Sequence, residues 1–164
     1  MYVMAPAHTT HGGSVDAVTL RSTRFGELEV PAEAVLEFPN GLIGLGGSRY
    51  TLLARSDEAM FVWLHSVDDP AIAIPLTNPW KFFADYAVEL SDGDQERIGI
   101  EDPAAAQVYV TVRAAEAIED FTANLRAPIL LVEGRGFQVI NQAPDSPVRI
   151  PLLAGVADKA GQAA

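Results

Sequence analysis

The stretch FVWLHSVDDPAIAIPLTNPWKFFADY, residues 61–86, decides the fold of this chain. It contains both tryptophans of the sequence, Trp63 and Trp80. The pattern predicts two β-strands separated by a turn at Asp68-Asp69-Pro70, because proline fixes φ and aspartate side chains stabilise turns. A second turn signal, Asn78-Pro79, ends the second strand.

The first of these strands has alternating side chains. Phe61, Trp63 and His65 share one face, and the intervening side chains, which include Leu64 and Ser66, share the other. Because both faces are largely apolar, we expect a strand at the centre of the core. The alternative left open by the sequence is that one face is core while Phe61 and Trp63 lie beneath a partner.

Short candidate strands separated by turn signals continue along the rest of the chain. They are predicted at 18–25 and 28–30 (a hairpin), 35–38, 50–54, 87–90, 107–113, 121–133 (broken by Pro128), 137–141 and 148–152. One short helix is predicted to begin after Ser91 and to end at Gly99. The pattern predicts a mostly β fold: a small antiparallel β-barrel-like single domain with one or two short helices.

Composition bounds the domain organisation. The 164 residues suffice for one domain with its own core. Residues 1–19 are predicted to be a flexible N-terminal extension, residues 20–152 the β domain, and residues 153–164 a flexible C-terminal tail, since both ends are rich in small and polar residues.

The charge balance narrows the classes of partner. Asp and Glu number 22 against 11 Lys and Arg, which gives a net charge of −11, and there is no cysteine. This excludes disulfides and thiolate zinc sites and disfavours direct contact with nucleic acid, which requires cations to displace counterions. A neutral or basic partner is favoured; the alternative is that acidity only provides solubility.

The sequence carries neither an apolar run long enough to span a bilayer nor the pattern of a signal peptide. We therefore expect a cytoplasmic protein that does not contact the membrane. His8 and His11, near the N-terminus, are interpreted as chance placements rather than as metal ligands, and no cofactor is predicted.

No group of residues predicts catalysis. His65, Ser66 and Asp69 suggest a hydrolase, but neighbouring residues on a strand point to opposite faces, so they are a poor triad. Asn124 and Arg126, two apart on the predicted strand, have the chemistry to bind a carboxylate; a structural salt bridge from Arg126 is the alternative. The chain is therefore predicted not to be an enzyme.

Six segments occur in sequence order between about Leu20 and Leu152: Arg24–Val30, Phe38–Leu42, Phe61–Pro70, Asn78–Tyr86, Asn124–Ile129 and Pro147–Leu152. Together they resemble the FliW family of flagellar assembly factors. One motif alone would be weak, but six in the same order are specific. The chain departs from the family pattern at Ile43-Gly44-Leu45-Gly46, where the family often carries proline, glycine, an aromatic residue and an acid. The family motif positions matched here are Phe38, Pro39, Gly41, Leu42, Leu64, Ser66, Asp69, Pro70, Asn124, Arg126 and Pro128.

The resemblance implies a non-enzymatic, mostly β, barrel-like protein with two partners. Such a protein would bind flagellin in the cytoplasm and antagonise CsrA, an RNA-binding translational regulator, so controlling flagellin synthesis; a monomer is expected when it is free. We predict four anchors for partners (Trp63, Phe82, Phe83 and Arg126) and four acidic residues that attract CsrA (Asp92, Asp94, Glu96 and Glu101). The alternative function is a small-ligand-binding β-barrel, unrelated to flagella, with Trp63, Trp80 and Arg126 around its pocket.

Overall fold

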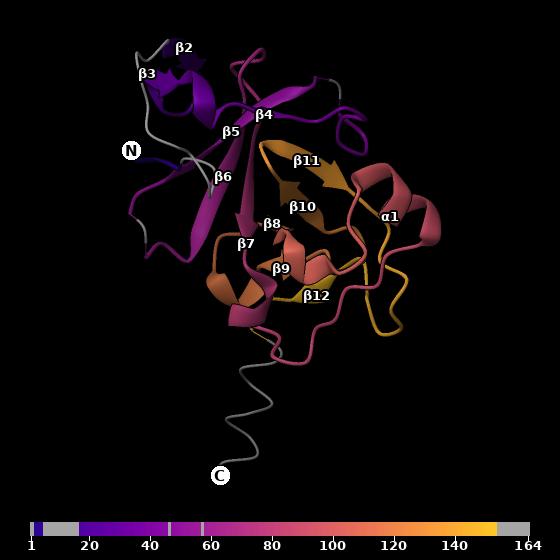
Figure 1. Cartoon of the computed structure of the whole chain (residues 1–164). Helices are drawn as coiled ribbons and strands as arrows, with labels where there is room; N and C mark the ends of the chain where they lie inside the picture. Colours follow the sequence, from indigo (N-terminus) through magenta and orange to yellow (C-terminus); the bar gives the residue numbers. More distant parts are fainter. Residues whose placement is uncertain (1, 5–16, 46, 57, 154–164) are drawn as a thin grey trace. The chain divides into compact units, whose positions relative to one another are not determined.

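The computed structural model describes residues 2–4, 17–45, 47–56 and 58–153 (Figure 1). Within this part of the chain there are twelve strands, one α-helix and four short 3-10 turns. Contacts divide the chain into two units: unit 1 contains Met1–Ile74 and Leu131–Phe137, and unit 2 contains Pro75–Leu130 and Gln138–Ala164.

Unit 1 is built from paired strands. Its elements are β1 (Tyr2–Met4), β2 (Ala17–Ser22), β3 (Gly26–Pro31), the 3-10 turn η1 (Ala32–Ala34), β4 (Leu36–Glu37), β5 (Arg49–Ala54) and β6 (Phe61–Ser66). β2 and β3 form an antiparallel hairpin, and β5 pairs antiparallel with β1, β4 and β6. Leu52 of β5 lies opposite both Met4 and Leu64.

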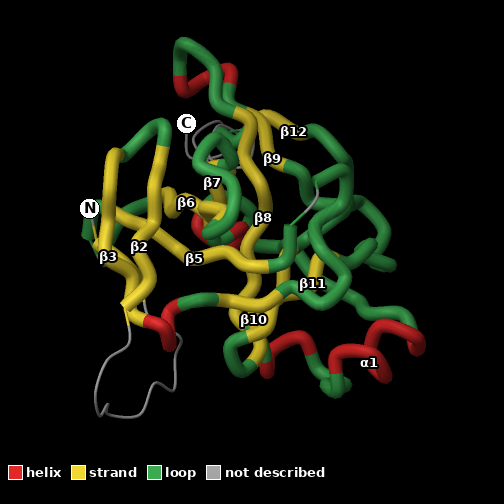
Figure 2. The backbone as a smooth tube through the Cα atoms, turned by 90° about the horizontal axis from the view of Figure 1, so that it is seen from above, coloured by secondary structure: helices red, strands yellow, loops and turns green. Residues whose placement is uncertain are grey.

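Unit 2 combines one seven-residue strand, β8, with strands of only two residues and with irregular loops; loops are drawn green in Figure 2. Its elements are η2 (Pro79–Lys81), α1 (Asp92–Ile98), η3 (Pro103–Ala105), β8 (Gln107–Arg113), η4 (Ile118–Asp120), β9 (Thr122–Ala123) and β12 (Ile150–Pro151). The residues of β7 (Ala73–Thr77), β10 (Ile129–Val132) and β11 (Arg135–Gln138) are divided between the units.

The hydrogen-bonded strand order confirms the predicted fold class. It runs β10-β11-β4-β5-β6-β7-β8-β9-β12, and β8 also pairs with β10, so seven of the strands follow a closed, barrel-like order. Strands β4 and β11 pair in parallel. The pairs β1–β5, β2–β3, β4–β5, β5–β6, β7–β8, β8–β9 and β9–β12 are antiparallel. The described residues contain one α-helix, as expected. The predicted domain boundaries at residues 20 and 152 remain predictions.

The core of unit 1 lies where the β2–β3 hairpin packs. Leu20, Val30, Ala34 and Leu53 are almost completely buried and form one cluster. Half-buried neighbours pack against it, among them Trp63. The alternation along β2 and β3 explains this cluster, since every second side chain of a strand points to the same face.

The side chain of Phe38 is fully buried, and its ring packs directly against the backbone at Gly136. A Cβ atom at Gly136 of β11 would lie 2.2 Å from Cζ of this ring, so only glycine fits there. The tight two-residue turn that leads into β11 has positive φ at Glu133 and Gly134, as the favoured hairpin turns require.

Several predicted elements match the structure closely. The strands at 50–54 and 107–113 correspond to β5 and β8, and the alternation at 61–66 corresponds to β6. The predicted helix is α1: the side chain of Ser91 accepts a hydrogen bond from Asp94 N, and Gly99 ends the helix with a φ of 85°. The carboxylate of Asp94 pairs with Arg97.

Other predictions were wrong. The strand expected over 121–133 is two strands, β9 and β10, joined by a loop, and residues 87–90 are irregular rather than a strand. The first hairpin turns at 23–25, earlier than predicted. Within the segment predicted to be a flexible N-terminal extension, which stays a prediction, residues 2–4 form β1 and residues 17–19 belong to β2. His8, His11 and residues 154–164 of the predicted tail lie outside the described residues.

Candidate partner-binding groove

An open groove of about 600 Å³ lies within unit 2. Two stretches of loop, between residues 82 and 89 and between residues 143 and 146, form its walls, and Leu125 and Ile150 complete it. The lining residues are Phe82, Phe83, Ala84, Asp85, Tyr86, Ala87, Glu89, Leu125, Ala143, Pro144, Asp145, Ser146 and Ile150. A smaller cavity of about 320 Å³ lies within unit 1 beside the first hairpin turn.

A buried hydrogen-bond network connects the residues that form the walls of the groove. The hydroxyl of Tyr86 donates to the carbonyl of Leu125 at 2.8 Å. The side-chain amide of Asn141 donates to Tyr86 Oη at 3.2 Å and to the carbonyl of Ala87 at 2.9 Å. Asn141 Oδ1 accepts from the backbone N–H groups of Glu89 and Ala143 at 2.9 and 3.0 Å. One buried asparagine therefore holds the two longest walls of the groove.

The environment of Tyr86 keeps its phenol neutral. Burial raises the pKa of Tyr86 to about 12, and the hydrogen bond from Asn141 opposes this rise only in part. A neutral phenol retains the proton that it donates to Leu125. Burial also raises the pKa of Tyr109 in β8.

The loop between β9 and β10 corrects the predicted arrangement of Asn124 and Arg126. Asn124 Oδ1 accepts from the backbone N–H groups of Arg126 and Ala127, which makes a turn instead of an extended strand. The exposed guanidinium of Arg126 donates from Nε to the carbonyl of Ser146 at 2.8 Å. Asn124 and Arg126 therefore shape the loop beside the groove and do not form a fork for a carboxylate on one strand face.

The charged side chains in the groove lining are all acidic. Asp85, Glu89 and Asp145 are exposed, and no lysine or arginine is among the lining residues. The apolar floor beneath them includes Phe82 and Leu125, which are 6% and 4% exposed. The groove therefore combines apolar contact area with negative charge.

The structure distributes the four predicted anchors over different surroundings. Phe82 is buried in the floor of the groove, and half-buried Phe83 lines it. Trp63 belongs to unit 1, where Phe25 packs on its ring with centroids 5.5 Å apart and the guanidinium of Arg24 lies 4.7 Å from its centroid. Side chains of its own chain thus cover part of Trp63, where the sequence left room for a partner.

Trp80 lies in η2 and is 41% exposed. Its indole N–H donates to the carbonyl of Tyr86 at 2.8 Å, and the two rings are 5.7 Å apart. It therefore lies behind a lining residue of the groove. Neither cavity described above is lined by Trp63, Trp80 or Arg126, the residues around which the small-ligand alternative was built.

The predicted acidic residues lie on and after α1. Asp92 and Glu96 are exposed on the helix, and Glu101 is exposed in the following turn. Asp94 is half-buried and pairs with Arg97 at 2.7 Å, so part of its charge is already compensated.

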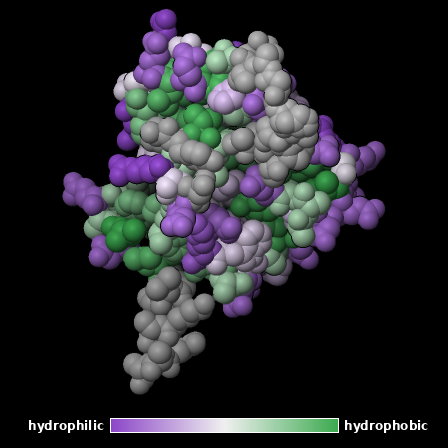
Figure 3. All heavy atoms as spheres, turned by 60° about the vertical axis from the view of Figure 1, so that its left-hand side comes forward, coloured by the Kyte–Doolittle hydropathy of each residue, from purple (hydrophilic) through white to green (hydrophobic). Residues whose placement is uncertain are grey.

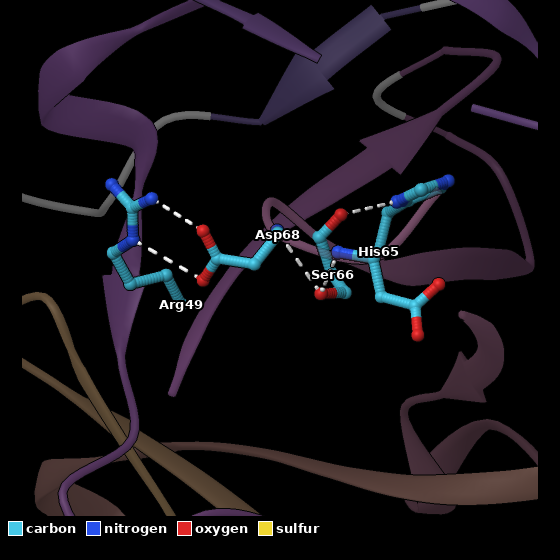
Figure 4. Close-up of polar contacts among 5 residues, drawn as sticks. Arg49, His65, Ser66 and Asp68 are labelled. Carbon is cyan, nitrogen blue, oxygen red and sulfur yellow. Dashed lines mark hydrogen bonds and ion pairs between the residues drawn. The ribbon is translucent and has the colours of Figure 1, made fainter. Parts of the chain in front are cut away.

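The residues that suggested a hydrolase instead build a turn (Figure 4). Ser66 Oγ accepts from the backbone N–H groups of Asp68 and Asp69. His65 is fully buried, and Nδ1 contacts its neighbour's carbonyl while Nε2 contacts Ser22 Oγ, both at 2.7 Å. The exposed carboxylate of Asp68 pairs with Arg49. His65 and Ser66 thus contact each other through a backbone carbonyl and not as base and nucleophile.

The family motif positions have structural roles of the same kind. Leu64 and Leu42 are buried, and Gly41 has a φ of 67° that favours glycine. The side chain of Asp69 accepts from Ala71 N, and the carbonyl of Pro70 accepts from Thr23 N. Exposed Pro39 follows buried Phe38, and the carbonyl of buried Pro128 accepts from Val139 N. Sequence reasoning missed Asn141, most of whose partners are distant in the chain.

The rest of the surface offers scattered apolar groups. On the face shown in Figure 3, hydrophobic residues form small patches separated by hydrophilic ones. No helix among the described residues is long and apolar enough to cross a membrane. The described residues also contain no group of three or more His, Asp or Glu side chains arranged for a metal ion. The large exposed apolar residues are Ile43, Leu45, Met60, Trp80, Ile118, Ile140 and Val148.

The closed strand order defines the class of protein, which is small, mostly β and barrel-like. The model of the FliW protein family matches residues 19–152. The chain therefore belongs to the FliW family, as the sequence motifs predicted. This is a family of flagellar assembly factors and is non-enzymatic, in agreement with the prediction that the chain is not an enzyme.

Known proteins agree with this assignment. The flagellar assembly factor FliW of Alkaliphilus metalliredigens is 40% identical over 114 residues, covering 68% of this chain and 70% of the relative. That of an Exiguobacterium species is 36% identical over 132 residues, covering 78% and 90%. A crystal structure of the flagellar assembly factor FliW superposes with a TM-score of 0.73 at 28% identity, covering 82% of this chain and 96% of that one.

Proposed function

We propose that this protein binds flagellin in the cytoplasm and antagonises CsrA by direct contact, and that it thereby controls flagellin synthesis. The observation that carries the proposal is the family match over residues 19–152, together with relatives that are named flagellar assembly factors. Flagellin binding and CsrA antagonism are what the resemblance to this family implies.

The mechanism is surface contact without chemistry. Flagellin that occupies the protein leaves CsrA free to repress translation, whereas unoccupied protein binds CsrA and relieves the repression. The net charge of −11 supports an encounter with CsrA, because an RNA-binding protein carries basic surface. The exposed acids Asp92, Glu96 and Glu101 would contribute to that attraction.

Calorimetric titration with monomeric flagellin from the same organism, at low and high salt, tests the first half of the proposal. We expect a saturable complex with a Kd of about 1 µM or below, and the difference between the two salt concentrations measures the share of charge in the affinity. Absence of heat and of a shift in elution volume at both salt concentrations would refute flagellin binding.

A second titration tests antagonism. CsrA bound to a labelled flagellin-leader RNA should release that RNA when the protein is added, and excess flagellin should restore RNA binding. RNA that stays bound while the protein demonstrably binds CsrA would show contact without antagonism and overturn this half of the proposal. A thermal-shift screen with metabolites tests the small-ligand alternative, for which we expect no shift.

A further inference from the structure

We propose that the groove in unit 2 is the docking site for a protein segment that places a large apolar side chain between lysine or arginine residues. This inference deepens the proposed function, since it names the surface that a protein partner would use and the chemistry of the segment that it accepts.

The size and rigidity of the groove favour a peptide. A volume of about 600 Å³ is room for a few side chains, and the groove is open rather than enclosed. Its walls are held in place by Asn141, which bonds to the backbone at Ala87, Glu89 and Ala143. A site formed in advance binds a partner without the entropic cost of ordering its own loops.

The floor supplies the apolar half of the recognition. Phe83 is half-buried and lines the groove, and Phe82, Leu125 and Ala143 lie behind it with exposures of 6%, 4% and 7%. An inserted leucine, methionine or phenylalanine side chain would remove the remaining exposed ring surface of Phe83 from water. Aromatic residues in such pockets are frequent anchors of protein interfaces.

The rim supplies the charged half. Asp85, Glu89 and Asp145 are exposed lining residues, and no lining residue is basic. None of the three forms an ion pair among those that the structure gives for its described residues, which join Arg49 to Asp68 and Arg97 to Asp94. Charge complementarity therefore selects a segment with cations on both sides of its apolar residue and rejects an acidic one.

The position of Trp80 provides a probe. Its indole donates to the carbonyl of Tyr86, a lining residue, while Trp63 belongs to unit 1. In a Trp63→Phe variant the remaining tryptophan therefore reports on the groove. If this variant folds poorly, the binding constant is measured instead by calorimetry on the unmodified chain.

The experiment uses three synthetic peptides of equal length, built from leucine and lysine, leucine and glutamate, or serine and lysine. We expect the leucine–lysine peptide to bind and to change the Trp80 emission. Neutralising the rim with Asp85→Asn, Glu89→Gln and Asp145→Asn should weaken its binding by about tenfold, as expected for three exposed charges. Asparagine is suited to position 145, where φ is 59°.

The matched control neutralises three exposed acids of unit 2 outside the groove: Glu116→Gln, Glu119→Gln and Asp120→Asn. The control variant should bind the leucine–lysine peptide like the unmodified chain. Equal weakening by both triple variants, or equal binding of the glutamate peptide, would overturn the proposed groove. Equal binding of the serine–lysine peptide would show general charge attraction and would also overturn it.

Flagellin separates this inference from the proposed function. If flagellin binds the unmodified chain and the groove variant equally well, the proposed function stands and the groove assignment is wrong. If the leucine–lysine peptide binds in the groove but flagellin does not bind, the groove stands and flagellin is not the partner.

Discussion

Unit 1 and unit 2 stabilise their backbones in different ways. In unit 1 the strands β1, β4, β5 and β6 form continuous ladders, and the β2–β3 hairpin closes over an apolar cluster around Leu53. In unit 2 the loops are held by side chains that bond to backbone groups, with Asn141 at the centre. Packing should therefore dominate the stability of unit 1, whereas in unit 2 the loops that surround its apolar core depend on a few polar side chains. Each unit contains one of the two tryptophans, so fluorescence can follow them separately.

The largest effect is expected from Gly136→Ala in unit 1. Its Cβ would meet the fully buried ring of Phe38 at 2.2 Å, so the ring or the strand must move. We expect a loss of about 3 kcal/mol in the free energy of unfolding, at the upper end for overpacking. Urea unfolding followed by Trp63 emission in a Trp80→Phe background measures it.

Gly93→Ala is the matched control, since nothing lies within 4 Å of a Cβ at that position and the residue is in helix α1. This substitution should stabilise the protein by up to about 1 kcal/mol. A Gly136→Ala protein as stable as the unmodified chain would contradict the close packing described for Phe38.

The counterpart in unit 2 is Asn141→Ala. It removes the acceptor for two backbone N–H groups and the donor to Tyr86 and Ala87, leaving buried polar groups without partners. We expect a cost of about 2–3 kcal/mol, because buried groups that lose their hydrogen bonds are expensive. Trp80 emission in a Trp63→Phe background is the measurement.

Exposed Gln142→Ala, next in the chain, should change the free energy of unfolding by less than about 0.5 kcal/mol. Should both substitutions have equally small effects, the network would not be what holds unit 2. Identical shifts at Trp63 and Trp80 in the Asn141 variant would show that the two units unfold as one.

Tyr86→Phe should have a smaller effect with a distinctive pH dependence. Loss of the hydrogen bond to Leu125 should cost about 1 kcal/mol near neutral pH. The folded pKa of about 12 lies above the ordinary value of 10.0, so the stabilisation by the neutral phenol is complete below about pH 10 and disappears as pH rises toward 12.

The unmodified chain should accordingly lose more stability than the phenylalanine variant between pH 10 and pH 12. Unfolding by urea at several pH values in this window measures the difference. Parallel curves for the two proteins would show that Tyr86 is not the group that titrates there.

The smallest effect is expected from Asp68→Asn in unit 1. The side chains of Arg49 and Asp68 are 45% and 47% exposed, so water already screens their attraction. We expect a change below about 1 kcal/mol that declines further at high salt. Thermal unfolding at two salt concentrations tests it, and a larger, salt-independent loss would mean that the turn depends on this carboxylate.

The fold could be predicted in both units wherever neighbouring residues in the sequence decide the local structure. Strands β5, β6 and β8 follow from local alternation, and α1 follows from its flanking Ser91 and Gly99. The segment around Asn124 has the apolar pattern of a strand, but its side chain bonds to the next backbone N–H groups and competes with the ladder. Family motifs identified the family although most of their residues shape turns.

The candidate groove was only partly predictable. Phe82 and Phe83 were expected to be anchors because they are large and aromatic, and both contribute to the lining. The bond from Ala143 is the local part of the role of Asn141, but the part that links the two walls has no local signal, because Tyr86 and Ala87 are 55 and 54 positions away. Trp63 could not be assigned from alternation, since alternation does not show that the β2–β3 hairpin covers that face.

The division of unit 1 into two pieces of sequence has a consequence for synthesis on the ribosome. Phe38 is made early, but Gly136, against which it packs, is translated only after residues 75–130 of unit 2. Because chains emerge from the amino terminus and domains fold as units, the first 74 residues must wait with an uncovered phenylalanine. A pause in translation before residue 131 would therefore hold the nascent chain in a state open to chaperones and proteases.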